Sequence, residues 1–327
     1  MTTATLEVRS NGALNAVQDL GRTGWLAHGV SNAGAMDPQA LSMANALAGN
    51  EAGCAAIEIS LFPFRAQLLA DVRLAWTGAD SAVTIDGIVH PPWWSVHASA
   101  GQTVTIAPPR RGARMYLACG GGIDVPQVLG SRSTDLKGGF GGLDGRGLKR
   151  GDQLTTAGQD IGNQRAFGVL PPERQGLFDE LDSGIVTLRA IAAAEYDTFT
   201  AEAQAAFTQT HYTITSEANR TGYRLDGTPL VLSHRLELLS HGIVPGTVQV
   251  PPNGQPIIQL ADANTCGGYP KIATVIETDI WRVAQAPVGT RLRFVMVSAD
   301  TVIQLRRTHA RTHQRLAADI SRWRQHP

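Results

Sequence analysis

Short apolar segments, interrupted every few residues by glycine or proline, limit the fold of this chain more than any other feature of its sequence. The 327 residues include 35 glycines and 17 prolines. Nine runs of four to six residues are rich in Val, Ile, Leu and Thr: 72–76, 82–85, 103–106, 114–118, 186–191, 247–250, 257–260, 272–276 and 292–297. Closely spaced short strands are typical of antiparallel barrels and sandwiches, whereas a doubly wound sheet alternates its strands with helices. The sequence therefore predicts a mainly β protein with few helices.

Three helices are expected among these strands. Asp37 is a suitable N-cap, Pro38 suits the first helical position, and Gly49 suits the end of the helix. Further helices are expected at 201–207 and 310–324. The last of them carries apolar residues at helical spacing, which predict docking on a core rather than nucleic-acid binding; they are Leu316, Ile320 and Trp323.

The segment 170–184 (LPPERQGLFDELDSG) combines a double proline with clustered acidic residues, which indicates a linker. It divides the chain into a first domain at 1–170, a second at 185–300 and a C-terminal helix at 301–327. The tetrapeptide Arg-Thr-Gly-aromatic occurs once on each side of this segment. We interpret it as a trace of two similar barrels, although a turn tetrapeptide also recurs by chance.

Composition excludes several classes of function. Basic and acidic residues balance at 28 each, so neither nucleic acid nor an anionic membrane is an expected partner. Three scattered cysteines argue against a disulfide scaffold and a structural zinc site. No run reaches the ~18 apolar residues of a membrane span, and the N-terminus lacks an apolar signal core. We expect a soluble, cytoplasmic protein.

Nucleotide and metal motifs are also missing. The chain has only three lysines, Lys137, Lys149 and Lys271, and none follows the Walker A pattern. The glycine-rich stretch 137–146 (KGGFGGLDGR) lacks dinucleotide spacing, so it is either a flexible surface loop or a loop whose amides and Arg146 meet an anion. The histidines are scattered, and the pair four residues apart in the tail has no glutamate between them; no metal site is expected.

One cysteine and one lysine lie beside a double glycine. The Gly-x-Ser-x-Gly elbow of serine hydrolases is absent. Cys266 directly precedes Gly267 and Gly268, so this cysteine is either a nucleophile whose thiol the neighbouring amides polarise or a packing residue beside a glycine turn. Tyr269 and the isolated Lys271 follow, and a lysine so placed can hold a developing negative charge.

We therefore predict a polar site built from glycine turns, amides and arginines. The turn 29–37 (GVSNAGAMD) ends at a helix N-terminus, where free amides suit a carboxylate, carbonyl or phosphate. Guanidinium groups suit planar carboxylates and amides. The candidate catalytic residues are Lys271, Asp262 and Arg220. The candidate substrate-binding residues are Ser31, Asn32, Asp37, Asn219, Arg224, Gln249, Gly267, Gly268 and Tyr269.

Five stretches resemble the KipA-like family, which is also called allophanate hydrolase subunit 2, the C subunit of 5-oxoprolinase, or biotin-dependent carboxyltransferase-like. They are 29–37, 121–126 (GGIDVP), 130–135 (GSRSTD), 249–257 (QVPPNGQPI) and 262–271 (DANTCGGYPK). The resemblance extends in order from about Leu6 to Val297. It implies tandem cyclophilin-like β-barrel domains, and it implies that the chain works with a KipI-like subunit.

The resemblance implies two activities on a small amide. In the first, the chain acts with KipI-like and LamB/YcsF-like subunits to open 5-oxoproline to glutamate with ATP, which is bound at the complex. In the second, it is the carboxyltransferase component of a biotin-dependent urea or amide carboxylase. A third, non-enzymatic alternative is an antagonist of a KipI-like kinase inhibitor. The family commonly has Arg-Gln-Thr-Thr where this chain has 263–266 (ANTC), so the resemblance identifies the family better than the substrate.

Overall fold

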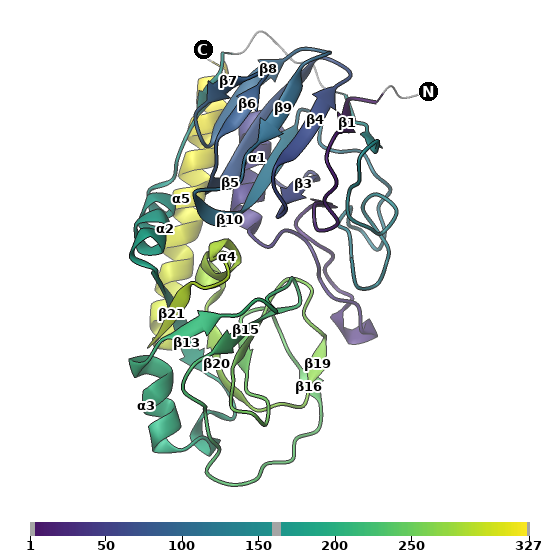
Figure 1. Cartoon of the computed structure of the whole chain (residues 1–327). Coiled ribbons are helices and arrows are strands. Elements are labelled where there is room, and N and C mark those ends of the chain that lie inside the picture. The colour runs from purple at the N-terminus through teal and green to yellow at the C-terminus, as the bar shows by residue number, and fades with distance from the viewer. Residues whose placement is uncertain (1–3, 159–164, 326–327) are drawn as a thin grey trace. The chain divides into compact units, whose positions relative to one another are not determined.

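The computed structural model describes residues 4–158 and 165–325, and their contacts divide into two compact units. The first unit comprises Met1–Arg22, Ala33–Gln175 and His313–Pro327, and the second comprises Thr23–Asn32 and Gly176–Thr312. Each unit is therefore assembled from separate segments of the chain, and each is described here by itself (Figure 1).

The first unit contains two six-stranded sheets. One has the order β11 (Gln153–Leu154), β1 (Leu6–Val8), β4 (Phe64–Leu68), β9 (Thr103–Ile106), β6 (Val83–Ile85), β7 (Ile88–His90). The other has the order β12 (Phe167–Gly168), β8 (Trp94–Ala98), β5 (Val72–Asp80), β10 (Arg111–Cys119), β3 (Ala56–Ile59), β2 (Ala16–Gln18). Antiparallel pairing predominates, as the closely spaced turns predict.

The main core of the first unit is built from residues of both sheets. Phe64 and Val104 of the first sheet belong to one buried cluster with Trp76 and Leu117 of the second. A second cluster on the other face of the second sheet includes α1 (Pro38–Ala48), whose small and apolar residues pack with Tyr116. This helix begins and ends as expected, with the Asp37 side chain accepting from the Ala40 N–H and Gly49 in the left-handed conformation.

The second unit is a closed seven-stranded barrel in the order β13 (Ile185–Ala192), β20 (Lys271–Val275), β17 (Thr247–Gln249), β18 (Ile257–Gln259), β15 (Gly222–Asp226), β14 (Tyr212–Ile214), β21 (Arg291–Met296). Alternate residues of β13 and β21 face inward, among them Leu188 and Phe294. These two strands pair in parallel, although only antiparallel pairing was expected. Two further strands, β16 (His241–Gly242) and β19 (Cys266–Gly267), form a separate two-stranded antiparallel sheet.

The helices differ from expectation in three places. Residues 170–184 are not a bare linker, because α2 (Pro172–Ser183) occupies them: Pro172 is the first helical residue, where proline is tolerated. The helix α4 (Glu277–Gln285) was not predicted, whereas α3 (Ala201–Gln209) was. The C-terminal helix α5 (Ala299–Gln325) is longer than expected. Within the first unit Ile320 is buried in the α1 cluster, but Trp323 is 50% exposed and does not belong to the docking face.

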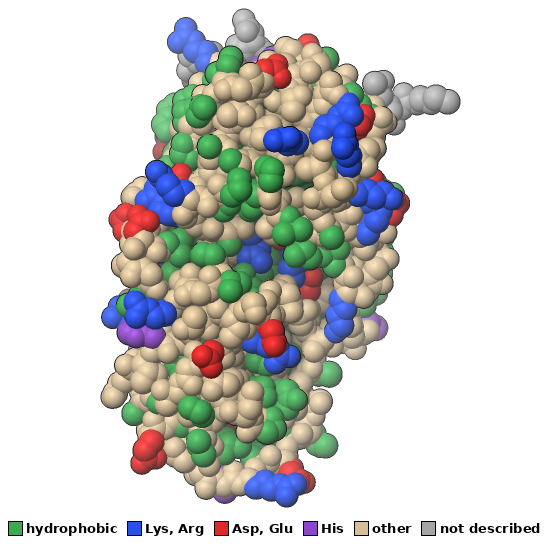
Figure 2. Space-filling view, in the orientation of Figure 1, with side chains coloured by type: hydrophobic (Ala, Val, Ile, Leu, Met, Phe, Trp, Pro, Cys, Tyr) green, Lys and Arg blue, Asp and Glu red, His purple; other side chains and the backbone are tan. Residues whose placement is uncertain are grey.

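The surface matches the balanced charge of the sequence. In Figure 2, Lys and Arg side chains lie interspersed with Asp and Glu on the face shown and do not gather into one broad patch. Among the residues that the structure describes, no helix combines the length and apolar character needed to span a membrane.

Candidate functional site

The most unusual polar group of the second unit is the ammonium of Lys271. The residue begins β20 and is 5% exposed. Its Nζ donates to the carbonyl oxygens of Gly267 and Tyr269, each at 3.1 Å, and it contacts Nε2 of His241. Burial lowers the pKa of Lys271, and the nearby Glu195 carboxylate opposes part of that effect.

Glu195 and His241 complete this cluster. Glu195 Oε2 accepts the main-chain N–H of Lys271 at 3.1 Å, and Oε1 lies 3.6 Å from Nε2 of His241. His241 is in β16, directly opposite Gly267 of β19, so one short strand pair positions both the imidazole and a carbonyl at the lysine. Neither Glu195 nor His241 was among the predicted site residues.

A buried amide lies on the same part of the barrel. Gln249 of β17 is the ladder partner of Lys271 in β20, and its Oε1 accepts from Gln259 Nε2 at 3.0 Å. Its own Nε2 is buried without a hydrogen-bond partner among the described residues. A Cβ added to Gly267 would lie 2.5 Å from this nitrogen. The Gln249 amide therefore fits in its position because residue 267 has no side chain. Leaving a buried donor unpaired is costly, so this N–H group is suited to donate a hydrogen bond to an oxygen atom of a ligand.

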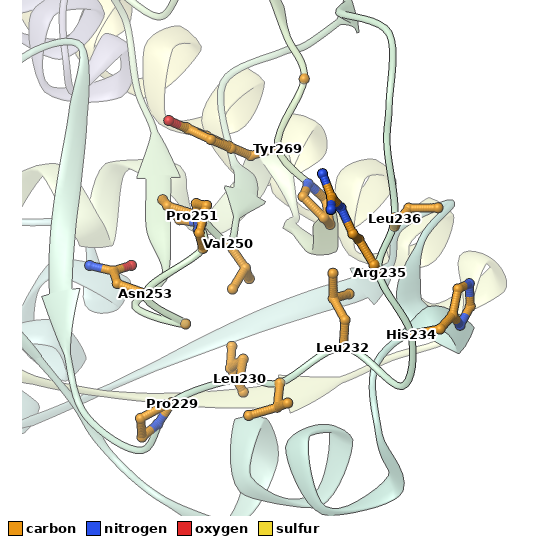
Figure 3. A pocket seen from close by; sticks show the side chains of 15 residues that line it. Pro229, Leu230, Leu232, His234, Arg235, Leu236, Val250, Pro251, Asn253 and Tyr269 are labelled. Atoms are coloured by element: carbon orange, nitrogen blue, oxygen red, sulfur yellow. The ribbon is translucent and has the colours of Figure 1, made fainter.

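Next to this cluster is a cavity of about 550 Å³, a size that suits a small molecule. Figure 3 shows the side chains around it, which come from the loop at 229–236, the turn at 250–254 and residues 268–270. The wall is mainly proline, leucine and valine, with a few polar groups such as Asn253 and Arg235. Tyr269 links the cavity to the lysine, because it borders the cavity and its carbonyl accepts from Lys271.

The other two predicted catalytic residues, Arg220 and Asp262, bind each other. Arg220 Nε and an Nη donate to the two carboxylate oxygens of Asp262, both at 2.9 Å, and both residues are buried. The main-chain N–H of Asp262 also donates to the Arg220 carbonyl. Because Arg220 precedes β15 and Asp262 follows β18, the pair closes the end of the β15–β18 ladder.

Asn219 and Arg224 are engaged locally. Asn219 Oδ1 accepts from the main-chain N–H groups of Thr221 and Gly222, which is an Asx-turn. Arg224 forms an exposed ion pair with Glu217 at 2.8 Å. The structure does not bring either side chain to Lys271, because Asn219 shapes the turn before β15 and Arg224 of β15 pairs with Glu217 at the surface.

The predicted residues of the 29–37 turn fall in different units. Asp37 belongs to the first unit, where it is fully buried, caps α1 and receives two hydrogen bonds from Arg174. Ser31 and Asn32 are half-buried and belong to the 23–32 segment of the second unit. The carboxylate of Asp37 is therefore committed to structure.

The structure also decides the alternatives left open for the glycine-rich loop and for Cys266. Arg146 of the glycine-rich loop donates to both carboxylate oxygens of Asp152, at 2.7 and 3.0 Å, so its charge is already paired. Cys266 is exposed, which contradicts the packing alternative. Within residues 4–158 and 165–325, no three His, Cys, Asp or Glu side chains gather as a possible metal site.

Comparisons with known proteins agree with this architecture. The family model described as carboxyltransferase domain, subdomain A and B, matches residues 28–296. The chain is 41% identical over 321 residues to the C subunit of 5-oxoprolinase from Escherichia coli, covering 98% of this chain and 99% of that protein. It is 40% identical to the corresponding 5-oxoprolinase protein of Haemophilus influenzae, covering 92% of this chain and 93% of that one.

A solved structure supports the same fold. The Kluyveromyces lactis urea amidolyase superposes with a TM-score of 0.86 and 26% identity, over 96% of this chain. This chain corresponds to only 20% of that much longer protein. Its full activity is therefore not transferred by the similarity.

Proposed function

Because the chain belongs to the carboxyltransferase domain family, subdomains A and B, we propose that it is the C subunit of an ATP-dependent 5-oxoprolinase. The reaction converts 5-oxo-L-proline, ATP and water to L-glutamate, ADP and phosphate. The observation that supports this most is the similarity to the Escherichia coli protein along nearly the whole length of both chains. We place the activity in the cytoplasm, and we assign it to the hydrolases that act on cyclic amides.

The substrate of this reaction offers the groups that the Lys271 cluster suits. Opening the ring breaks the bond between the carbonyl carbon and the nitrogen, puts the oxygen of water on the carbon and adds a proton to the nitrogen. The unpaired Nε2 of Gln249 suits the substrate's amide oxygen, and the ammonium of Lys271 suits developing charge. Gly267, Gly268 and Tyr269 supply the adjoining wall of the site.

The other candidate residues have supporting tasks in this proposal. Arg220 and Asp262 hold the end of the β15–β18 ladder, which leads into the segment that carries Gly267. Asn219 shapes the turn before β15. We assign none of these three to bond making or breaking.

The chain is expected to act with KipI-like and LamB/YcsF-like subunits. ATP needs cations for its phosphates, and Arg146, the arginine of the glycine-rich loop, is already bound to Asp152. We therefore assign the nucleotide contacts to the assembled complex and derive no step of the reaction through ATP in this chain.

Reconstitution tests this proposal. We expect the chain alone to form no glutamate from 5-oxoproline and ATP, and a mixture with both partner subunits to form it. Leaving out this chain is expected to abolish turnover. Activity of the isolated chain, or an inactive complete mixture, would contradict the proposal.

A second candidate is carboxyl transfer to urea or a related amide, favoured by the likeness to the urea amidolyase. This function depends on a biotinylated partner, so avidin would inhibit it, whereas 5-oxoprolinase turnover is expected to be insensitive to avidin. The regulatory alternative finds no support in these comparisons.

A further inference from the structure

All the donors of the Lys271 ammonium have acceptors. An ammonium has three N–H groups, and Nζ of Lys271 is in contact with the carbonyl oxygens of Gly267 and Tyr269 and with Nε2 of His241. For His241 to accept at Nε2, its imidazole must be neutral and carry its hydrogen on Nδ1. In that tautomer, the Lys271 ammonium is the donor and His241 Nε2 is the acceptor of this contact.

Glu195 contacts both Lys271 and His241. One carboxylate oxygen accepts from the Lys271 main chain at 3.1 Å, and the other lies 3.6 Å from His241 Nε2. The side chain of Glu195 is only 10% exposed. Among the described residues, Glu195 and Lys271 are the charged groups found at ion-pair or hydrogen-bond distance from His241. Glu195 therefore lies against both the main chain of Lys271 and the imidazole of His241.

Solvent exposure is much greater for His241 than for Lys271. Lys271 is 5% exposed, so solvent does not reprotonate it freely. The side chain of His241 is 45% exposed, and it contacts the lysine directly. The imidazole is thus the one group of this trio that reaches both water and the buried ammonium.

We propose that His241, held by Glu195, carries protons between solvent and Lys271 during turnover. This inference rests on the proposed function of the Lys271 cluster. As the carbon–nitrogen bond of the substrate breaks, Lys271 turns the N–H that it donates to the carbonyl of Tyr269, a residue of the cavity wall, toward the substrate nitrogen. The nitrogen takes that proton, and the ammonium becomes a neutral amine. A proton from water is then added at Nε2 of His241, whose Nδ1 keeps its hydrogen. His241 passes this Nε2 proton to the amine, so that Lys271 is again an ammonium and His241 is again neutral. His241 is a positioning and relay residue, because it acts through Lys271.

Substitution and chemical rescue in the reconstituted complex test the relay. We expect His241→Ala to lower kcat on the order of 10²-fold with little change in KM. Added imidazole is expected to restore part of kcat, because the vacated position is half exposed. His241→Gln keeps an acceptor for the lysine but carries no proton, so it is expected to remain slow. Wild-type kcat in both variants would overturn the proposal.

A measurement without turnover separates this proposal from the proposed function. Amine labelling of the full chain reports on Lys271 against two internal standards, Lys137 and Lys149. In the wild type, the pH dependence of Lys271 labelling is expected to carry a second inflection, because the proposed proton uptake by His241 changes the group that contacts the amine. His241→Gln should remove that inflection, and Glu195→Gln should speed Lys271 labelling because its charge supports the ammonium. Identical Lys271 profiles in all three proteins would overturn the relay even if the complex hydrolyses 5-oxoproline, whereas an inactive complex with the expected profiles would overturn only the function.

Discussion

Gln249 and Lys271 lie directly opposite each other in the antiparallel ladder of β17 and β20. Cross-strand partners extend to the same face of a sheet, so the amide and the ammonium share one side of the barrel. Gly267 meets both, because its carbonyl accepts from Lys271 and its α-carbon packs beside the Gln249 amide. These contacts explain why the first residue of the double glycine, Gly267, has to be a glycine: a side chain there would displace the Gln249 amide.

Filling that space should disable the site without unfolding the barrel. In Gly267→Ala, the new methyl group would lie 2.5 Å from Gln249 Nε2, so the amide must move. We expect a large loss of substrate binding, measured as a raised KM in the reconstituted complex. Gly242→Ala on the paired strand is the control, because its methyl group meets no atom within 4 Å. Equal KM values for the two variants would refute the steric argument.

The stability of the protein should depend on Lys271 in a pH-dependent way. Burial lowers the pKa of Lys271 in the folded chain, while the unfolded chain keeps the ordinary value of about 10.4. Between these two values the unfolded state binds more protons, so stability rises with pH in that window. We expect the wild type to gain stability relative to Lys271→Met as the pH rises toward that ordinary value, as measured by urea denaturation at a series of pH values. A difference that stays constant or falls would contradict the lowered pKa.

The Arg220–Asp262 pair should act as a structural brace. Removing one partner leaves a buried charge uncompensated, so Arg220→Met is expected to cost about 3–5 kcal/mol of unfolding free energy. The double variant Arg220→Met, Asp262→Leu is expected to recover most of this loss. Urea denaturation of the three proteins measures both effects. A double variant as unstable as the single one would show that Arg220 contributes through contacts other than Asp262.

The three cysteines should differ widely in reactivity. Burial raises the pKa of Cys119 to about 12 and also raises that of Cys54, while Cys266 is exposed. At pH 8 the thiolate fraction of Cys119 is therefore on the order of 10⁻⁴. A chromogenic disulfide reagent should detect one fast thiol, which disappears in Cys266→Ser, and all three after denaturation. A fast thiol that persists in Cys266→Ser would contradict this assignment.

Local signals in the sequence were sufficient for the strands and for α1. Alternating apolar runs mark most barrel strands, and Asp37, Pro38 and Gly49 mark both ends of the helix. The helix α4 was missed because it follows β20 immediately and its N-cap, Ile276, makes no side-chain capping bond. The double proline that leads into α2 was taken as a linker, since proline favours both linkers and first helical turns, and Pro172 is the first residue of this helix.

The site was only partly predictable. The glycines and the rare lysine pointed to 267–271, but the partners of Lys271 are distant in sequence: Glu195 by 76 residues and His241 by 30. His241 lies in a strand of two residues, too short for any periodicity to reveal. Arg220 and Asp262 were expected to act on substrate, and their mutual pairing across 42 residues became visible only when the barrel brought the two strand ends together.

Product formation by the assembled enzyme tests the central claim most directly. With labelled 5-oxoproline and ATP, the complete mixture containing the wild-type chain is expected to release glutamate and ADP in equal amounts. Lys271→Met is expected to reduce glutamate formation by about 10²-fold or more, while Lys149→Met on the exposed surface of the first unit keeps wild-type turnover. Unchanged glutamate formation with Lys271→Met would contradict the assignment of this site to amide hydrolysis.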